Sequence, residues 1–139
     1  MATPTHLAHK PIASVDDYEL YDGIYARYTD VKSLSIGKAQ YDGGEISVKV
    51  WRHTGTKWSR QSEELPLHRI IDLNTTILKS MLISAGIPEP TTQLNIKVIA
   101  PADLNLIMEY YKNNREHLLP KLRELKVILD YFMQEEPKL

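Results

Sequence analysis

Residues Glu45-Ile-Ser-Val-Lys-Val-Trp-Arg-His53 form the stretch of the chain that most clearly predicts its fold. Ile46, Val48 and Val50 alternate with polar or amphipathic neighbours. This period of two is typical of a β-strand that has one side against a core and the other toward water. We therefore expect a strand over residues 45–53 with these three aliphatic side chains on its inner face.

Turn sequences stand on both sides of that strand. Asp42-Gly43-Gly44 precedes it and Thr54-Gly55 follows it. Glycine accepts the positive φ that tight hairpin turns require. Residues 33–41 and 57–63 would supply the neighbouring strands. The pattern predicts an antiparallel β-meander over residues 33–63, with the more polar 57–63 strand at an edge.

The segments before and after the meander follow other patterns. Pro4 and Pro11 prevent a helix over residues 1–15, which we expect to be an extended N-terminal arm. Residues 66–134 are expected to be mainly helical, in three helices over about 66–85, 101–113 and 115–134, with an extended connector or short strand at 92–99. The fold class is therefore α+β, a small antiparallel β-meander packed by three helices.

The first helix has recognisable ends. Pro66 suits the first helical position, where its missing N–H is no loss. Gly86 follows the apolar stripe of the helix and is a plausible C-terminal cap.

Composition narrows the class of protein. The 139 residues fit a single domain over 1–139. Lys plus Arg is 17 and Asp plus Glu is 18, and this near balance argues against generic nucleic-acid binding. The chain has no cysteine, and no apolar run approaches the roughly 20 residues that cross a bilayer. We expect a cytoplasmic protein with no membrane partner, no cofactor and no metal.

Both tryptophans lie in the segment that follows the central strand. If Thr54-Gly55 is a two-residue loop, Trp51 faces Trp58 and Lys49 faces Arg60 across a hairpin. The two indoles and two cations would then share one outward surface. Aromatic rings beside cations are typical of sites that bind anionic or planar partners.

The cross-strand pair of Lys49 and Arg60 would need a negative partner, because like charges directly opposite are destabilising. Glu63 or Glu64 would supply it internally, and an anionic ligand would supply it externally. The first turn of the following helix, with His68 and Arg69, would add donors and a positive dipole end. The candidate ligand-binding set is Lys49, Trp51, Arg52, His53, Trp58, Arg60, His68 and Arg69.

The last helix carries a heptad seam. Its members repeat with steps of four and three, and they are Leu118, Leu122, Leu125, Leu129 and Phe132. About two heptads are short of a free-standing coiled coil. The seam would either pack against the protein's own core or form a homodimer. Pro120 lies close to the start, so the regular helix is expected to begin there.

Several motifs resemble an uncharacterised family of small bacterial domains of unknown function, over about residues 3–85. They are Thr5-His-Leu-Ala-His-Lys-Pro11, Asp22-Gly-Ile-Tyr-Ala26, Leu34-Ser-Ile-Gly-Lys-Ala-Gln40, and Val50-Trp-Arg-His-Thr-Gly-Thr-Lys-Trp-Ser-Arg-Gln-Ser-Glu-Glu-Leu-Pro-Leu-His-Arg69. The resemblance implies no activity, so it assigns no catalytic residue.

Three classes of function are consistent with these patterns. The first is a binding module that sequesters or senses an anionic small molecule, of which a nucleotide is one candidate. The second is a protein-interaction or dimerisation module built on the heptad seam. The third is a hydrolase or transferase that uses His53 or His68 as a general base. The cationic and aromatic surface favours the first class.

Overall fold

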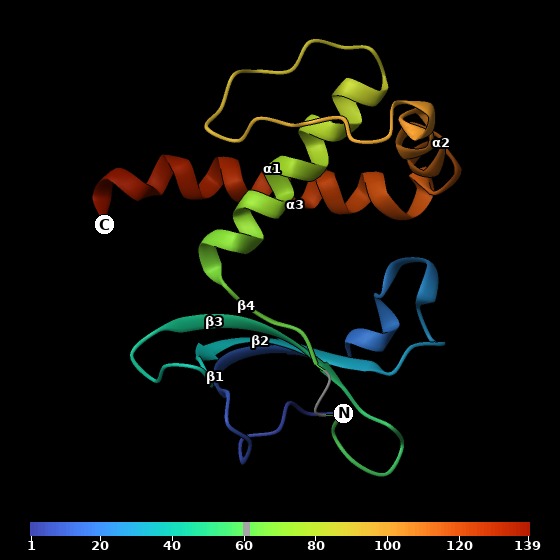
Figure 1. Ribbon diagram of the computed structural model, residues 1–139. Helices are drawn as coiled ribbons and strands as arrows, with labels where there is room; N and C mark the ends of the chain where they lie inside the picture. Colours follow the sequence, from blue (N-terminus) through green and yellow to red (C-terminus); the bar gives the residue numbers. More distant parts are fainter. Residues whose placement is uncertain (60–61) are drawn as a thin grey trace. The chain divides into compact units, whose positions relative to one another are not determined.

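The computed structural model describes residues 1–59 and 62–139 (Figure 1). The chain divides into two compact units, residues 1–78 and residues 79–139. The first unit holds the β-sheet, and the second holds the C-terminal helices. A single cooperative domain over 1–139 stays a prediction.

The sheet of the first unit is a four-stranded antiparallel meander in the order β1-β2-β3-β4. Its strands are β1 (Lys10–Asp16), β2 (Val31–Lys38), β3 (Ile46–Arg52) and β4 (Glu64–Pro66). Two 3-10 turns, Tyr18–Leu20 and Gly23–Tyr25, connect β1 to β2. The α+β class and the antiparallel meander predicted from sequence are confirmed.

Strand β1 corrects the expectation of an N-terminal arm. Residues 10–16 pair with β2, and a register shift between Pro11 and Ala13 accommodates the proline. His9, immediately before the strand, is fully buried. A polar side chain anchors the segment, and the prolines that exclude a helix still allow an edge strand.

The face of the sheet that is buried is not the one that the sequence predicted. In the register of β2 with β3, Leu34 pairs with Val50 and Ile36 with Val48, so the aliphatic residues do share a face. That face stays partly exposed, however, and Ile36 is 38% exposed. The opposite face is the buried one, and Ser33, Ser47 and Trp51 on it are 0% exposed.

The turn after β3 is longer than predicted. The backbone N–H of Thr54 donates to the carbonyl of Lys57 at 2.8 Å, and an isolated bridge pairs His53 with Trp58. Among the described residues of the predicted 57–63 strand, only Trp58 takes part in a bridge, and the regular strand β4 begins at Glu64. Residues 60 and 61, which include the candidate Arg60, lie outside the described part of the chain.

Helix α1 (Leu67–Ser84) follows β4 directly, and Pro66 is the last residue of the strand rather than the first of the helix. The helix ends as predicted. Gly86 has a φ of 73°, and the N–H of Ile87 donates to the carbonyl of Leu82 at 2.9 Å. Such a bond across a left-handed residue is typical of a glycine C-cap.

The second unit contains a 3-10 turn (Pro101–Asp103), α2 (Asn105–Asn113), α3 (Arg115–Glu135) and a final 3-10 turn (Glu136–Lys138). Helix α3 confirms the predicted range of about 115–134, and Pro120 lies inside it, so the expectation that the regular helix begins only at Pro120 was wrong. The 92–99 segment is a connector with no regular structure, tied down by buried Lys79, whose Nζ donates to the carbonyl of Leu94 at 2.6 Å. No described helix is long and apolar enough to cross a membrane.

The closest approach of β1 to β2 yields a stability prediction. A Cβ on Gly37 would lie 2.1 Å from the carbonyl oxygen of Lys10 and 2.7 Å from the Cα of Pro11. Both are backbone atoms, so Gly37→Ala must displace β1. We expect the free energy of unfolding, measured with urea, to fall by about 1–3 kcal/mol.

Gly43→Ala is the matched control, because nothing lies within 4 Å of a Cβ at that position. Its effect should stay below about 1 kcal/mol. Equal stabilities of the two variants would contradict the pairing of β1 with β2.

Candidate ligand-binding site

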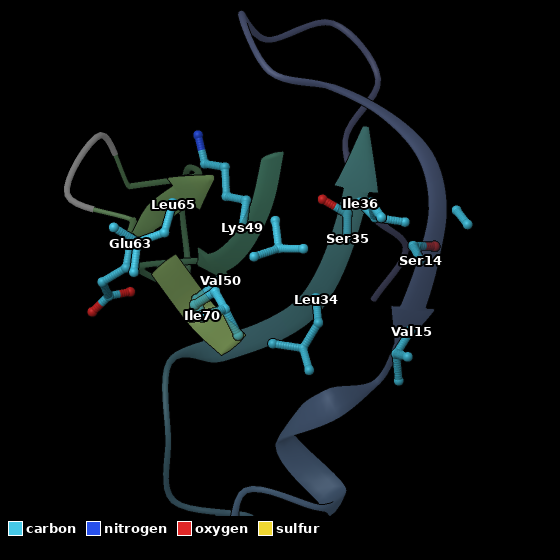
Figure 2. Close-up of a pocket in the computed structure, with 12 residues that line it drawn as sticks. Ser14, Val15, Leu34, Ser35, Ile36, Lys49, Val50, Glu63, Leu65 and Ile70 are labelled. Atoms are coloured by element: carbon cyan, nitrogen blue, oxygen red, sulfur yellow. The ribbon is translucent and has the colours of Figure 1, made fainter. Parts of the chain in front are cut away.

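Each face of the sheet has a pocket of its own chemical character. On the aliphatic face, a pocket of about 460 Å³ is lined mainly by apolar side chains (Figure 2). Val15, Leu34, Val50 and Leu65 come from the four strands, and Ile70 comes from the first turn of α1. Its two charged lining residues, Glu63 and Lys49, are of opposite sign, so this mainly apolar pocket has no excess of positive charge for an anion.

A second pocket, of about 670 Å³, is lined by residues 6–8, by Gln40 and Lys49, and by the loop from His53 to Ser59. We call it the basic pocket. Its ionisable side chains are Lys49, Lys57, His6 and His53, and Trp58 lines it too. None of its described lining residues carries a carboxylate.

The two indoles do not share an outward surface, and this prediction was wrong. Trp51 is fully buried, whereas Trp58 is half-buried and lines the basic pocket. Their rings meet edge to face, with centroids 6.0 Å apart and planes at 76°. The reason is that the side of the sheet that holds Trp51 is the buried one, where its Nε1 donates to Ser35 Oγ at 2.8 Å. The longer turn in addition pairs His53, instead of Trp51, with Trp58.

Lys49 lines the basic pocket and also contacts buried Trp51. Its Nζ is 4.2 Å from the centroid of the Trp51 ring, which is a cation–π contact. Its cross-strand partner is Glu64 rather than the predicted Arg60. Burial lowers the pKa of Lys49, and the nearby charge of Glu64 opposes this shift.

A buried hydrogen-bond network centred on His9 joins the N-terminal segment to the sheet. His9 Nδ1 is 2.8 Å from Glu64 Oε1, and its Nε2 is 3.0 Å from Ser35 Oγ. Trp51 Nε1 donates to the same Ser35 oxygen at 2.8 Å. The neutral ring with its proton on Nδ1 satisfies every one of these contacts, since Ser35 then donates to Nε2.

The same connectivity of serine, histidine and carboxylate occurs in nucleophilic hydrolases. A nucleophile must be reachable by substrate, however, and Ser35 is only 7% exposed; it belongs to the lining of the aliphatic pocket and not to that of the basic pocket. Its oxygen also accepts from Trp51. We therefore assign a structural role to the network: it satisfies buried polar groups and holds Trp51 and the N-terminal segment in place.

Glu64 is the acceptor on which this network converges. Its Oε1 accepts from Ser47 Oγ at 2.6 Å and from the backbone N–H of Gln40 at 3.1 Å, in addition to His9. Burial by itself would raise the pKa of Glu64, but these hydrogen bonds outweigh it and hold the pKa below its ordinary value.

Arg52 is engaged elsewhere. Its Nη1 lies 2.6 Å from Asp30 Oδ1, and its Nη2 lies 2.8 Å from Glu63 Oε1. Hydrogen bonds to these two carboxylates raise the pKa of Arg52 above its ordinary value. The guanidinium is thus already neutralised by the protein, and it does not line the basic pocket.

His53 is held by its own turn. The backbone N–H of Gly55 donates to His53 Nδ1 at 3.0 Å, so the neutral ring carries its proton on Nε2. This arrangement leaves the Nε2–H as a donor on a side chain that lines the pocket.

Of the eight residues predicted from sequence, three line the basic pocket: Lys49, His53 and Trp58. Exposed His68 and Arg69 of α1 do not line it. Sequence reasoning missed His6, Gln40 and Lys57 as lining residues, and it missed buried His9. The signal for His6 and His9 was present in the Thr5–Pro11 motif, which was treated as part of an arm.

These features define a small α+β protein whose antiparallel sheet has a basic, aromatic pocket on one side. Residues 1–87 match the model of a family of unknown function, DUF6530, and the chain belongs to that family. The resemblance expected from sequence is thereby confirmed. The match includes the whole sheet and the basic pocket. No curated protein and no solved structure matches the chain.

The network predicts a pH-dependent effect of Glu64→Gln. At about pH 7 the variant should lose about 1–3 kcal/mol of unfolding free energy, because an amide replaces the charged acceptor of buried donors. The folded-state pKa of Glu64 lies below its ordinary value of 4.5, so the carboxylate stabilises the fold above that pH. This contribution is lost as the pH falls through the lowered pKa, so urea unfolding should show the two proteins converging as the pH is lowered below 4.5.

Glu63→Gln serves as the matched control for that experiment. The Glu63 side chain is 53% exposed and pairs with Arg52 at the surface, where an ion pair contributes about 0–1 kcal/mol. A loss at Glu64 no larger than the loss at Glu63 would disprove the structural role of the network.

Proposed function

We propose that this protein is a cytoplasmic binding module that holds an anionic small molecule, such as a nucleotide, in the basic pocket. The observation that carries the proposal is the lining of that pocket, which combines two lysines, two histidines and an indole with no described carboxylate. Its volume of about 670 Å³ suits a ligand of mononucleotide size. The cysteine-free sequence is in keeping with a reducing compartment.

Lys57 is the cation best placed to bind an incoming anion. It lies in the loop after β3, is exposed, and has no acidic partner within ion-pair distance among the described residues. Lys49 differs, because Glu64 is its cross-strand partner and Trp51 lies against its ammonium group. We therefore expect Lys57 to contribute more to affinity than Lys49.

Trp58 favours a ligand with a planar group over a simple inorganic anion. Its ring is fixed by edge-to-face contacts with Trp51 and with His53, the latter at a centroid distance of 5.0 Å. A ring already held in place loses little conformational freedom when a ligand packs on it. Because Trp58 is half-buried, part of the indole stays accessible for contact with a nucleobase.

The alternative of a hydrolase or transferase has less geometric support. His53 lines the basic pocket, but His68 does not. His53 Nδ1 already accepts the N–H of Gly55, and a general base needs a free acceptor within reach of the proton that it removes. Binding without chemistry is the function that the pocket supports best.

The proposal predicts a dependence on phosphate charge. Titration with AMP should change tryptophan fluorescence saturably, and calorimetry should give an affinity at least tenfold higher, about 1.4 kcal/mol, than that of uncharged adenosine. Trp58→Phe should abolish most of the fluorescence change, because Trp51 is sealed from solvent. Absence of saturable binding by AMP, ADP and inorganic phosphate at about 10 mM would refute the proposal.

Lys57→Ala tests the site within the pocket. We expect roughly tenfold weaker AMP binding, the size of one charge-assisted hydrogen bond. Lys38→Ala removes the same charge from an exposed position of β2 outside the pocket, and it should change the affinity by no more than about twofold, since exposed charges are screened. Equal losses in the two variants would mean that net charge, and not this pocket, governs binding.

A further inference from the structure

The C-terminal half of α3 has an exposed apolar face. Leu125, Ile128, Leu129 and Phe132 are 41%, 68%, 52% and 50% exposed. Their spacing of three and four residues places them along one side of the helix, and half-buried Leu122 continues the row toward the N-terminus. A contiguous apolar surface of this kind marks an interaction site.

The charges beside this face distinguish a parallel from an antiparallel pair of α3 helices. In the heptad that places Leu122 and Leu129 at a, the g positions are Lys121, Ile128 and Glu135, and the e positions are Leu119, Lys126 and Met133. In a parallel pair of helices, each g residue meets the e residue five positions later on the partner. Lys121 would then face Lys126 of the second copy, a residue of like charge that is already paired with Asp130 of its own helix, so the parallel pair gains no attraction at these positions.

An antiparallel pair reverses this outcome. There g residues meet g residues, so Lys121 faces Glu135 of the second copy, twice by symmetry, and Ile128 meets its own counterpart at the centre. The carboxylate of Glu135 also binds Lys138 of its own chain at 2.9 Å, so Lys121 would share it. Leu125 packs in one layer with Leu129 of the other copy. At the e positions Lys126 meets itself, but its charge is already paired with Asp130 of the same helix, at 2.5 Å.

The composition of α3 argues against a lipid membrane as the partner of this apolar face. Helices that lie on anionic membranes carry an excess of Lys and Arg on the polar face. In α3 the basic residues are matched one for one by acidic residues: Arg115, Lys121, Arg123 and Lys126 against Glu116, Glu124, Asp130 and Glu135.

We propose that α3 pairs antiparallel with α3 of a second copy of this chain, centred near Ile128, and so forms a symmetric homodimer. This inference goes beyond the proposed ligand binding and does not depend on it. The contact covers about two heptads, which is smaller than a standard interface, so the dimer should dissociate on dilution.

Charge reversal tests the orientation, because the same substitution weakens one arrangement of the dimer and strengthens the other. Lys121→Glu should weaken the antiparallel dimer by roughly fivefold or more in sedimentation equilibrium, and Lys121→Glu combined with Glu135→Lys should restore it. In a parallel dimer Lys121→Glu would instead strengthen association. Arg123→Glu, at an outer position of the heptad, is the control and should have little effect.

The absence of native cysteine allows a direct test by disulfide trapping. An oxidised mixture of Leu125→Cys and Leu129→Cys proteins should yield the mixed 125–129 disulfide, identified by mass, in preference to either self-linked dimer. Val127→Cys is the control, since that residue is 66% exposed at the outer f position and should not cross-link.

Three results would overturn the proposal. They are a monomer at every concentration, a preferred 125–125 disulfide, and monomeric binding to phosphatidylglycerol vesicles that Ile128→Glu abolishes. Circular dichroism and urea unfolding of each variant would separate loss of pairing from loss of folding.

Discussion

The first unit depends on one buried acceptor, the carboxylate of Glu64. It accepts hydrogen bonds from His9, Ser47 and the backbone of Gln40, and these donors lie up to 55 residues from Glu64 in the chain. A buried carboxylate is tolerated only when such donors surround it. The N-terminal segment, β2, β3 and β4 are therefore positioned by shared polar contacts, in addition to the backbone ladders of the sheet.

This polar interior also organises the candidate site. Ser35 bridges His9 and Trp51, and Trp51 in turn contacts the ammonium group of Lys49 and the ring of Trp58. The lining of the basic pocket thus rests on a rigid second layer of side chains. A rigid layer limits the conformational freedom that Lys49 and Trp58 would lose when a ligand binds.

The sequence predicted the features that follow from local periodicity. The strand around Val48 and Val50 and the glycine cap at Gly86 were recognisable because each depends on neighbours within a few residues. The inner face of the sheet was assigned wrongly. Serines alternating beside a tryptophan read as a solvent-facing pattern, and only the long-range contact from His9 makes that side the buried one.

The site was predicted only in part, for a related reason. A turn of four residues instead of two gives Trp58 a new partner, His53 in place of Trp51, and this shift of two positions leaves Trp58 on the predicted face of the sheet. Three of the predicted site residues, Lys49, His53 and Trp58, nevertheless line one pocket. The contribution of His6 and Gln40 comes from tertiary proximity, which no spacing in the sequence reveals.

The position of β1 at the rim of the sheet has a consequence for the behaviour of the protein in solution. A sheet with a partly exposed aliphatic face would be liable to grow by adding strands from other molecules, and fibrils form in this way. Pro11 lacks an N–H for such pairing, and the register shift beside it bends the strand. The irregularity that fits the proline into β1 also protects the rim from aggregation.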